Sequence, residues 1–319
     1  MKNPRLSILM IALIGCTVYS MTTGNFRPVV IANSDEYNTL TAAEAKILLR
    51  EGTERAFSGE YHNSKEEGLY ICKLCDRPLF DSVSKFDSKS GWPSFDDFLP
   101  GAIVEKPDGG RTEIECANCG GHIGHVFRGE MFTAKDTRHC ANSLALNFVA
   151  KANEERGIFA GGCFWGVEHH LERIPGVLTV ISGYVGGTVP NPTYQNVLSK
   201  RTGHAEAVEV IYDSSKVSYE KIAKMFFEIH DPTQVDRQGP DIGEQYRSEV
   251  FYVNDEQKAT AEKLIDILKS KGMNVATKVT LAGTFWPAED YHQDYYAVTG
   301  KEPYCHSWTQ RFDDDEEVM

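Results

Sequence analysis

Two Cys-x-x-Cys pairs constrain the fold of the first half of this chain more than any other feature. They are Cys72 with Cys75 and Cys116 with Cys119, and each pair lies in a segment typical of a hairpin turn. Two such turns supply four thiolates at the spacing that one tetrahedral zinc ion requires. About forty residues separate the pairs, so a shared ion would clamp two distant segments of one domain. The other interpretation, two disulfides or redox-active dithiols, stays open in an oxidising compartment.

Length and charge limit the organisation and the partners. A chain of 319 residues with 41% apolar and 25% charged residues is long enough for two domains, each with its own core. The formal net charge is −13. Binding to phosphate backbones depends on lysine and arginine releasing counterions, so we expect no nucleic-acid partner.

The N-terminus has the layout of an export signal. Lys2 and Arg5 precede an apolar run over residues 6–14, which is too short to span a bilayer. The sequence LIGC at residues 13–16 resembles a bacterial lipobox. This resemblance implies a signal over 1–16 and lipid on Cys16. The protein would then be extracytoplasmic, held in the periplasm or cell envelope by its lipid alone. The alternative is an uncleaved signal anchor or a fortuitous apolar start, with Cys16 an ordinary buried cysteine.

The first half of the chain is expected to be mainly β. Residues 17–36 lack hydrophobic periodicity and are typical of a tether, and Thr41 with Glu44 forms a helix capping box that opens a helix ending near Gly52. Residues 68–149 consist of short apolar or aromatic runs broken by turn residues, which indicates antiparallel strands. We therefore expect a first domain over 37–150.

A polar linker over 151–156 leads to a second domain over 157–308, and an acidic tail follows over 309–319. The second domain begins with a buried strand and glycine turn at 157–162, a helix with Val167, Leu171 and Ile174 on one face, and a strand at 177–183, which together form a βαβ unit. Further helices are expected at 218–230 and 254–271, and strands at 205–211, 249–253 and 275–281. This pattern predicts an α/β domain, an α+β sandwich with a mixed sheet.

Two further cysteines have the surroundings of reactive thiols. Cys163 lies where a strand turns into a helix, so free amide N–H groups and the helix dipole should lower its pKa and favour the thiolate. The adjacent Phe164 and Trp165 either belong to the core or form a slot for a small apolar group. Cys140 follows Arg138 and His139, whose positive charge would favour a thiolate in the same way.

Several motifs, taken together, resemble known families. The chain resembles B-type methionine sulfoxide reductases in both Cys-x-x-Cys pairs and in three further motifs. These are GWPSF at 91–95, CGGHIGHVF at 119–127 and RHCANS at 138–143. The chain resembles A-type reductases in four motifs: GCFWG at 162–166, GHAE at 203–206, DIGEQYRS at 241–248 and EDYHQ at 289–293. The resemblance covers about 37–308 and implies a B-type domain fused N-terminal to an A-type domain. It implies reduction of free and protein-bound methionine sulfoxide, the R epimer by the B-type half and the S epimer by the A-type half.

For the A-type half, the resemblance implies that Cys163 attacks the sulfoxide sulfur and becomes a sulfenic acid while Glu206 acts as the acid. The sequence supports this role, because Glu206 shares a strand face with Val208 and Val210 and should have a raised pKa. A salt-bridged strand residue is the alternative. The resemblance implies that the sulfoxide oxygen or its leaving water is held by Tyr194, Asp241 and Tyr246. It also implies that the methyl group is cradled by Phe164 and Trp165. Tyr291 and His292 either line this pocket or have structural roles.

Cys305 matches the A-type resolving cysteine, on a mobile C-terminal segment. The resemblance implies that it forms a disulfide with Cys163, which thioredoxin or a thioredoxin-like reductant opens. One structural zinc ion and no organic cofactor are expected.

For the B-type half, the resemblance implies that Cys140 is the nucleophile, that His125 and Asn142 hold the oxygen with His122 behind them, that Arg138 tunes the thiolate and that Trp92 packs on the methyl group. The two histidines could instead bind a metal.

Two positions depart from the B-type pattern. Ser90 replaces the frequent resolving cysteine, and Gly129 replaces an acidic residue that the adjacent Glu130 could substitute. We therefore expect Cys140 to be recycled by the external donor or by a neighbouring thiol such as Cys305. A thiol peroxidase or disulfide oxidoreductase, and a zinc-stabilised adaptor without activity in one half, are the rival functions.

Overall fold

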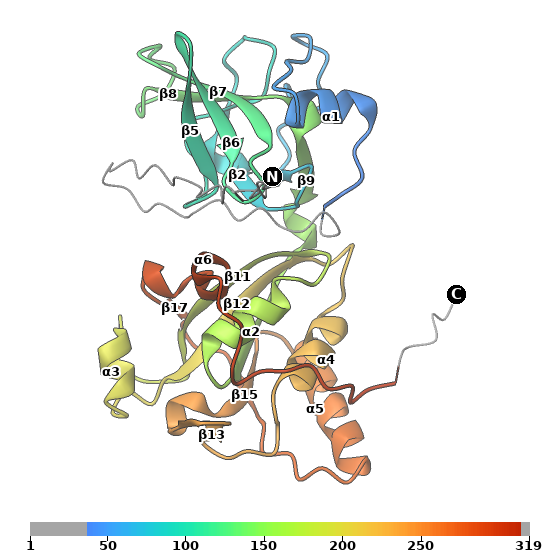
Figure 1. The fold of residues 1–319 in the computed structure, drawn as a ribbon, viewed down its shortest axis with the longest axis vertical. Coiled ribbons are helices and arrows are strands. Elements are labelled where there is room, and N and C mark those ends of the chain that lie inside the picture. Colours follow the sequence, from blue (N-terminus) through green and yellow to red (C-terminus); the bar gives the residue numbers. More distant parts are fainter. Residues whose placement is uncertain (1–36, 314–319) are drawn as a thin grey trace, which may run out of the picture.

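Residues 37–313 are described by the computed structural model, and they form two units that follow each other along the long axis of the molecule (Figure 1). The expected lipobox, the tether over 17–36 and the last residues of the acidic tail lie outside this range. Within residues 37–313, no helix is both long enough and apolar enough to cross a membrane.

The first unit is mainly β, as predicted. Helix α1 (Ala42–Leu48) opens with the expected capping box of Thr41 and Glu44. All strand pairs are antiparallel, in two sheets ordered β2-β1-β9 and β3-β4-β8-β7-β6-β5. The strands are β1 (Gly68–Cys72), β2 (Pro78–Asp81), β3 (Lys85–Phe86), β4 (Ser94–Phe95), β5 (Ile103–Asp108), β6 (Arg111–Cys116), β7 (His122–Arg128), β8 (Thr137–Ala141) and β9 (Leu146–Ala150). Phe80 stacks on Phe95 in the core between them, with ring centroids 4.2 Å apart.

The second unit contains one mixed sheet in the order β16-β15-β10-β12-β11-β17. Its strands are β10 (Glu154–Gly161), β11 (Val177–Val185), β12 (Ala205–Asp213), β15 (Ser248–Tyr252), β16 (Lys278–Leu281) and β17 (Trp286–Pro287), with β13 (Arg237–Gln238) and β14 (Asp241–Ile242) in a separate hairpin. Both β10 and β11 run antiparallel to β12, which lies between them. The predicted βαβ unit is therefore present, but a third strand separates its two parallel strands.

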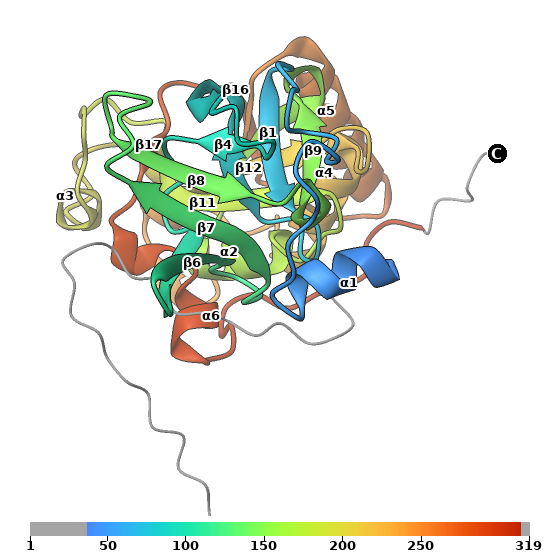
Figure 2. The same ribbon diagram turned by 90° about the horizontal axis from the view of Figure 1, so that it is seen from above.

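Helices cover the sheet of the second unit. They are α2 (Phe164–Leu171), α3 (Tyr194–Leu198), α4 (Tyr219–Ile229), α5 (Asp255–Ser270) and α6 (Tyr295–Thr299). Helices α4 and α5 lie side by side, and α3 lies at the far end of the sheet from them in both views (Figures 1 and 2). Both long helices begin where expected, because Ser218 and Asn254 accept hydrogen bonds from the N–H groups of Lys221 and Gln257.

The two units contact each other through both apolar and charged residues. A small cluster joins Leu69, Ile71 and Val149 of the first unit to Leu178 of the second. Two ion pairs flank it, Asp76 with Lys216 at 3.0 Å and Arg77 with Asp294 at 3.7 Å. The connection is short, since β10 already begins at Glu154 within the expected 151–156 linker.

Candidate active sites

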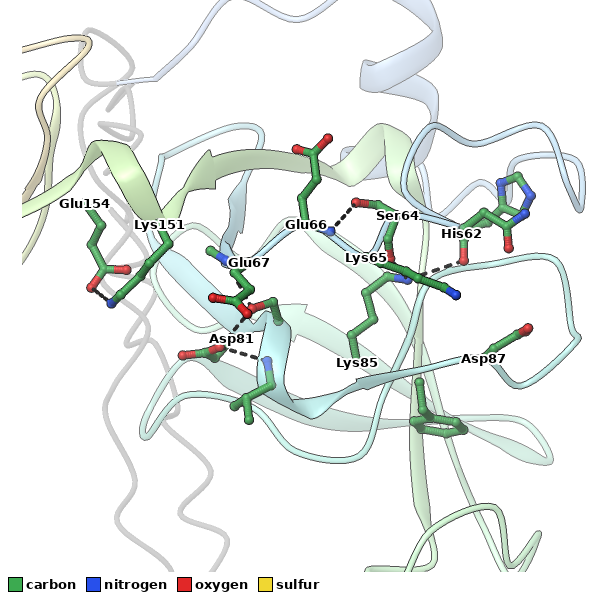
Figure 3. Close-up of a pocket in the computed structure, with 15 residues that line it drawn as sticks. His62, Ser64, Lys65, Glu66, Glu67, Asp81, Lys85, Asp87, Lys151 and Glu154 are labelled. Atoms are coloured by element: carbon green, nitrogen blue, oxygen red, sulfur yellow. Dashed lines mark hydrogen bonds and ion pairs between the residues drawn. The ribbon is translucent and has the colours of Figure 1, made fainter.

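A polar cavity of about 630 Å³ lies near the junction of the two units (Figure 3). It is lined by segments 62–68 and 81–87 together with Lys151 and Glu154. Lys85 lies inside it and donates to the carbonyl oxygen of Ser64 at 2.9 Å. No cysteine lines this cavity, so the thiol chemistry belongs elsewhere.

The four cysteines of the first unit occupy two turns with the same geometry. In the first turn the N–H of Asp76 donates to the carbonyl of Cys72, and in the second the N–H of Gly120 donates to the carbonyl of Cys116, each at 2.9 Å. Asp76 and Gly120 have φ values of 56° and 70°, so each turn closes through a left-handed residue four positions after its first cysteine. Because both turns have this same backbone geometry, two segments that are distant in the chain place their sulfur atoms in the same way.

The four sulfur atoms fit a tetrahedral metal. They lie within 4.8 Å of one another, and Cys72 Sγ lies 3.6 Å from Cys119 Sγ, as Cys75 Sγ does from Cys116 Sγ. A zinc–sulfur bond of 2.3 Å separates tetrahedral ligands by about 3.8 Å. All four are free cysteines, which contradicts the interpretation as two disulfides. Hydrogen bonds among these thiols raise the pKa of Cys72 and Cys116 and lower that of Cys75.

Cys163 is the N-cap of α2, directly after the glycine turn that ends β10. Its side chain is buried, with 5% exposed. The neighbouring Cys305 thiol, followed by burial, raises the pKa of Cys163, and the N–H of Trp165, which lowers it, does not compensate. The expectation of a lowered pKa is therefore wrong for the structure, because burial and a second thiol outweigh the helix terminus.

Glu206 lies beside this cysteine. It is 1% exposed on the face of β12 that carries Val208 and Val210, and its Oε2 accepts a hydrogen bond from the N–H of Phe164 at 3.3 Å. The other oxygen, Oε1, is buried and has no hydrogen-bond partner in the described part of the chain. Burial, followed by the Cys163 thiol, raises the pKa of Glu206 well above its ordinary value. A protonated carboxyl with one free oxygen therefore lies next to the thiol.

Three polar side chains, those of Tyr194, Tyr246 and Asp241, lie near enough to Glu206 to interact with its carboxyl group. Burial raises the pKa of Tyr194 to about 12 and also raises that of Tyr246, and in both cases the Glu206 carboxyl adds to the effect. Both hydroxyls therefore stay protonated at physiological pH and can donate. Asp241 belongs to the short strand β14 and accepts from the hydroxyl of Tyr304 at 3.0 Å. The structure thus brings together the three residues expected to hold an oxygen.

Phe164 and Trp165 belong to an aromatic cluster at the start of α2. Trp165 stacks on Tyr295 with ring centroids 3.7 Å apart, and its indole N–H donates to Nδ1 of His292 at 3.1 Å. His292 is 1% exposed and also contacts the ring of Phe164 at 5.0 Å, whereas Tyr291 is 64% exposed. His292 therefore orients the aromatic slot, while Tyr291 faces solvent.

Cys140 lies in β8 opposite His125 of β7 and Ser94 of β4. Burial raises the pKa of its thiol, although Arg138 and Ser90 lower it. Here too the structure contradicts the expected thiolate. His139 does not help, because its ring points into the core, hydrogen-bonds the carbonyl of Phe95 and has a pKa lowered by burial.

The side chains expected beside Cys140 have acidic partners. Arg138 makes two hydrogen bonds to Glu130 at 2.6 and 2.9 Å, so Glu130 supplies an acidic partner although position 129 is glycine. His122 contacts Glu113, and His125 contacts Asp108 at 2.8 Å. Each histidine is therefore held by a carboxylate.

The two histidine rings lie on one face because of a β-bulge. Residues three apart in a regular strand point to opposite faces. In β7, however, His122 pairs with Glu115 and His125 pairs with Glu113, so Ile123 is the extra residue and both rings meet at 5.5 Å.

Comparison with known proteins agrees with this geometry. The peptide methionine sulfoxide reductase family matches residues 155–317, which is just over half of the chain, and the SelR domain matches residues 40–150. The chain belongs to the peptide methionine sulfoxide reductase family. It joins a B-type domain to an A-type domain and is a peptide-methionine (R)- and (S)-S-oxide reductase.

Individual relatives match the second half. Peptide methionine sulfoxide reductase MsrA of Nautilia profundicola is 49% identical over 150 residues, covering 47% of this chain and 87% of the relative. The MsrA of Pasteurella multocida is 49% identical over 152 residues with the same coverage. Among solved structures, reduced Mxr1 of Saccharomyces cerevisiae is 30% identical, with a TM-score of 0.48, over 51% of this chain and 96% of that one.

Two carboxylates, Glu54 and Glu113, and one serine, Ser88, escaped sequence reasoning about this reductase, and Glu289 was included only as part of the EDYHQ motif, without a role. Glu54 is 7% exposed and accepts from the N–H groups of Ser143 and Leu144 at 2.7 and 3.1 Å, while its own carbonyl accepts from the indole of Trp92. Glu54 N–H donates to Asn142 Oδ1, and Asn142 Nδ2 donates to the carbonyl of Ile123. The Asn142 amide is therefore largely occupied, and one N–H of its Nδ2 group lies outside these two hydrogen bonds. The nearly ninety residues between Glu54 and its partners explain why no local pattern signals this contact.

The other missed residues support the two reductase sites in a similar way. Glu289 accepts from the N–H of Tyr194 at 2.9 Å and from the hydroxyl of Tyr184 at 3.0 Å, so it fixes the start of α3 against β11. Glu113 holds His122 in the B-type site. Ser88 links the hydroxyls of Ser90 and Ser94 at 2.8 Å each and completes a polar chain under Cys140.

Proposed function

We propose that each half of this reductase uses its own cysteine, Cys163 for the S epimer and Cys140 for the R epimer of methionine sulfoxide. The observation that carries the proposal is the contact of a buried, protonated Glu206 with the turn that holds Cys163. A peroxidase needs no apolar slot, whereas Phe164 and Trp165 provide one for the methyl group of the substrate.

In the A-type half, Cys163 Sγ attacks the sulfoxide sulfur while Glu206 donates its proton to the sulfoxide oxygen. The oxygen is transferred to Cys163, methionine leaves, and the proton of the original thiol restores the acid on Glu206, so atoms and charge balance. The hydroxyls of Tyr194 and Tyr246 stabilise the oxygen. Because the resting thiol is neutral, we expect the substrate to trigger ionisation of Cys163 only when it occupies the pocket.

The Cys163 sulfenic acid is then attacked by Cys305, whose thiol contacts Cys163 in the structure. The sulfur–sulfur bond forms, water leaves, and a thioredoxin-like dithiol reduces the disulfide. The segment after Cys305 is anchored, since the N–H groups of Ser307 and Thr309 donate to carbonyls at the end of α4. This anchoring differs from the mobile segment expected from the sequence and keeps Cys305 near its target.

In the B-type half, Cys140 attacks the R epimer with Arg138 nearby to stabilise its thiolate. His125, with His122 behind it, and the free N–H of Asn142 bind the oxygen, and Trp92 packs on the methyl group. Ser90 supplies a hydroxyl rather than a thiol next to Cys140. We therefore propose that two thiols of the external donor reduce the Cys140 sulfenic acid directly, releasing water and a donor disulfide.

The four clustered cysteines would hold one structural zinc ion. The donor set, the near-tetrahedral spacing and the two matching turns support zinc over a redox role. Bound zinc would keep all four thiolates charged and lock the two turns together. It takes no part in the reaction.

Protein-bound and free methionine sulfoxide are both proposed substrates, which would make the enzyme a repair factor under oxidative stress. The residues LIGC at 13–16 support lipidation of Cys16 and an extracytoplasmic, membrane-anchored enzyme. Replacing Cys16 by Ala should move the protein from the membrane to the soluble fraction. Wild-type protein recovered entirely in the soluble fraction would rule the anchor out.

Epimer-resolved assays of single-cysteine variants test the assignment. Cys163→Ser should abolish reduction of the S epimer and spare the R epimer, and Cys140→Ser should do the opposite. Loss of both activities in either variant would contradict two independent sites. Turnover of peroxide without turnover of either sulfoxide would favour a thiol peroxidase instead.

A further inference from the structure

We propose that His306 is the catalytic base of the resolving step, taking the proton from the Cys305 thiol as Cys305 Sγ attacks Cys163. The inference rests on the proposed function of these two cysteines. His306 Nδ1 lies 3.0 Å from Cys305 Sγ, and His306 Nε2 lies 2.8 Å from the carbonyl oxygen of Gly161. One imidazole thus connects the resolving thiol to the backbone of the turn that carries the nucleophile.

The partners of the ring fix which nitrogen carries the proton. A carbonyl oxygen can only accept a hydrogen bond, so Nε2 must be protonated to bind Gly161. In a neutral imidazole Nδ1 then has a free lone pair, and the Cys305 thiol donates to it. The ring is oriented as a proton acceptor for this one sulfur atom.

Packing holds the ring in that orientation. His306 is 5% exposed, and it lies against two glycines of the motif around Cys163. A Cβ on Gly166 would lie only 2.1 Å from His306 Nδ1, and a Cβ on Gly162 would lie 2.5 Å from Gln238 and 3.6 Å from the His306 ring. Only glycine at position 166 lets the His306 ring approach α2 this closely. Gly166 has no reactive group, but it therefore fixes the ring that contacts the resolving thiol.

Both neighbours of Cys305 in the chain are anchored at the site. Tyr304 donates its hydroxyl to the carboxylate of Asp241 on one side, and His306 donates to Gly161 on the other. Cys305 is therefore held between two hydrogen bonds that end on the pocket of Cys163.

Burial, not neighbouring charge, keeps the ring neutral. Burial lowers the pKa of His306 to about 4, with Gly161 and Asp241 opposing the effect. His170 of α2 and His230 at the end of α4 also face it, and burial lowers the pKa of both. Above about pH 5 the base form is therefore fully present.

The step balances as follows. Nδ1 of His306 accepts the thiol proton, the Cys305 sulfur forms a bond to Cys163 Sγ, and the sulfur–oxygen bond of the sulfenic acid breaks. Glu206 protonates the departing hydroxide to give water. The imidazolium then returns its proton, through solvent, to the Glu206 carboxylate. Nothing is oxidised or reduced beyond the two sulfur atoms that form the disulfide.

Single turnovers of the full-length enzyme with methionine (S)-sulfoxide, without reductant, test the inference. Methionine release, sulfenic acid at Cys163 trapped by a dione, and the disulfide Cys163–Cys305 are measured in the same samples. His306→Gln retains an amide N–H for Gly161, and His306→Asn retains an acceptor near Nδ1, but neither side chain takes up a proton. We expect the disulfide to form at least about tenfold more slowly per methionine released, with sulfenic acid accumulating, since a general base contributes about 10²–10⁴-fold.

The pH profile separates a base from a structural ring. In the wild type the disulfide step should stay flat from pH 8 to about pH 5. In His306→Gln it should fall about tenfold per pH unit, as for an ordinary thiol that must ionise in solvent. His62→Gln, which alters a ring of the B-type half that hydrogen-bonds the carbonyl of Gly59, is the matched control and should behave as the wild type.

Two results would overturn the inference. If His306→Gln and His306→Asn match the wild type in rate and pH profile, the ring is structural while the proposed function stands. If the wild type releases no methionine from the S epimer, the proposed function fails and the inference fails with it. If the variants do not fold, the wild type alone still tests the inference. A rate of disulfide formation that falls tenfold per pH unit below pH 8 in the wild type would show that His306 is not a base.

Discussion

Glu206 illustrates how burial assigns a chemical role to one residue. Its pKa is raised, so the acid form is present below that raised pKa and is lost as the pH rises through it. Glu206→Gln keeps a similar shape but removes the proton that the sulfoxide oxygen needs. We expect kcat for the S epimer to fall about 10²–10⁴-fold, with the R epimer unaffected, in steady-state assays on the two purified epimers.

The same strand offers the control for this variant. Glu209 lies on the opposite face of β12 and pairs with Arg156 at 2.8 Å. Glu209→Gln should therefore leave both activities within about twofold, because a partly exposed ion pair on the face away from the site contributes little. Equal losses in the two variants would mean that Glu206 acts through strand stability rather than as an acid.

Ser90 provides a second test at the residue level. Its hydroxyl interacts with the Cys140 thiol at the position where B-type relatives frequently carry a resolving cysteine. Ser90→Cys should convert the Cys140 sulfenic acid into a disulfide after one turnover with the R epimer, seen as a loss of two thiols by mass spectrometry. The wild type should instead retain a trappable sulfenic acid. A disulfide between Cys140 and a zinc-site cysteine in the wild type would contradict direct recycling.

The sequence predicted which side chains lie together around the two cysteines better than it predicted the ionisation of those cysteines. Local charge and the helix terminus predicted thiolates at Cys140 and Cys163, but the structure raises both pKa values by burial. Burial depends on segments that are distant in the chain, so it cannot be inferred from adjacent residues. Glu54 escaped for the same reason, since its partners Ser143 and Leu144 lie nearly ninety residues away.

At the level of elements, prediction succeeded where capping and periodicity coincide. Helices α4 and α5 lie within one residue of the ranges expected from Ser218 and Asn254. It failed where tertiary contacts replace local signals: α2 ends at Leu171 rather than continuing to Ile174, and the two-residue strands β3 and β4 have no periodicity of their own. The bulge that aligns His122 with His125 is likewise set by pairing with β6.

The start of α2 depends on a glycine that the helix itself does not need. Gly166→Ala should gain up to about 1 kcal/mol in helix propensity. The new methyl group, however, would collide with His306, and overpacking costs about 1–3 kcal/mol. We expect a net loss of stability in urea titrations together with slower disulfide formation. Gly283→Ala, where nothing lies within 4 Å of the added Cβ, should change neither. A stabilised, fully active Gly166→Ala would show that the ring moves aside without consequence.

At the level of the whole molecule, the two halves have separate cores but share a boundary at the zinc-type turns. Asp76 and Arg77 directly follow Cys75 and pair with Lys216 and Asp294 of the A-type half. Asp294 precedes α6, whose Tyr295 stacks on Trp165. The four-cysteine cluster is thus linked to the A-type pocket only indirectly within the described residues, through partly exposed ion pairs that contribute little energy.

Metal removal should therefore separate the two activities. Because a structural zinc site couples binding to folding, chelation should unfold the B-type domain and abolish reduction of the R epimer. The A-type domain keeps its own core, so kcat/KM for the S epimer should stay within about twofold. We would measure metal content, both epimer activities and thermal unfolding before chelation, after chelation and after zinc is restored. The variant Cys75→Ser removes one ligand and should have the same effect as chelation. If both activities decline together and return together, the halves fold as one cooperative unit and the boundary is stronger than its ion pairs suggest.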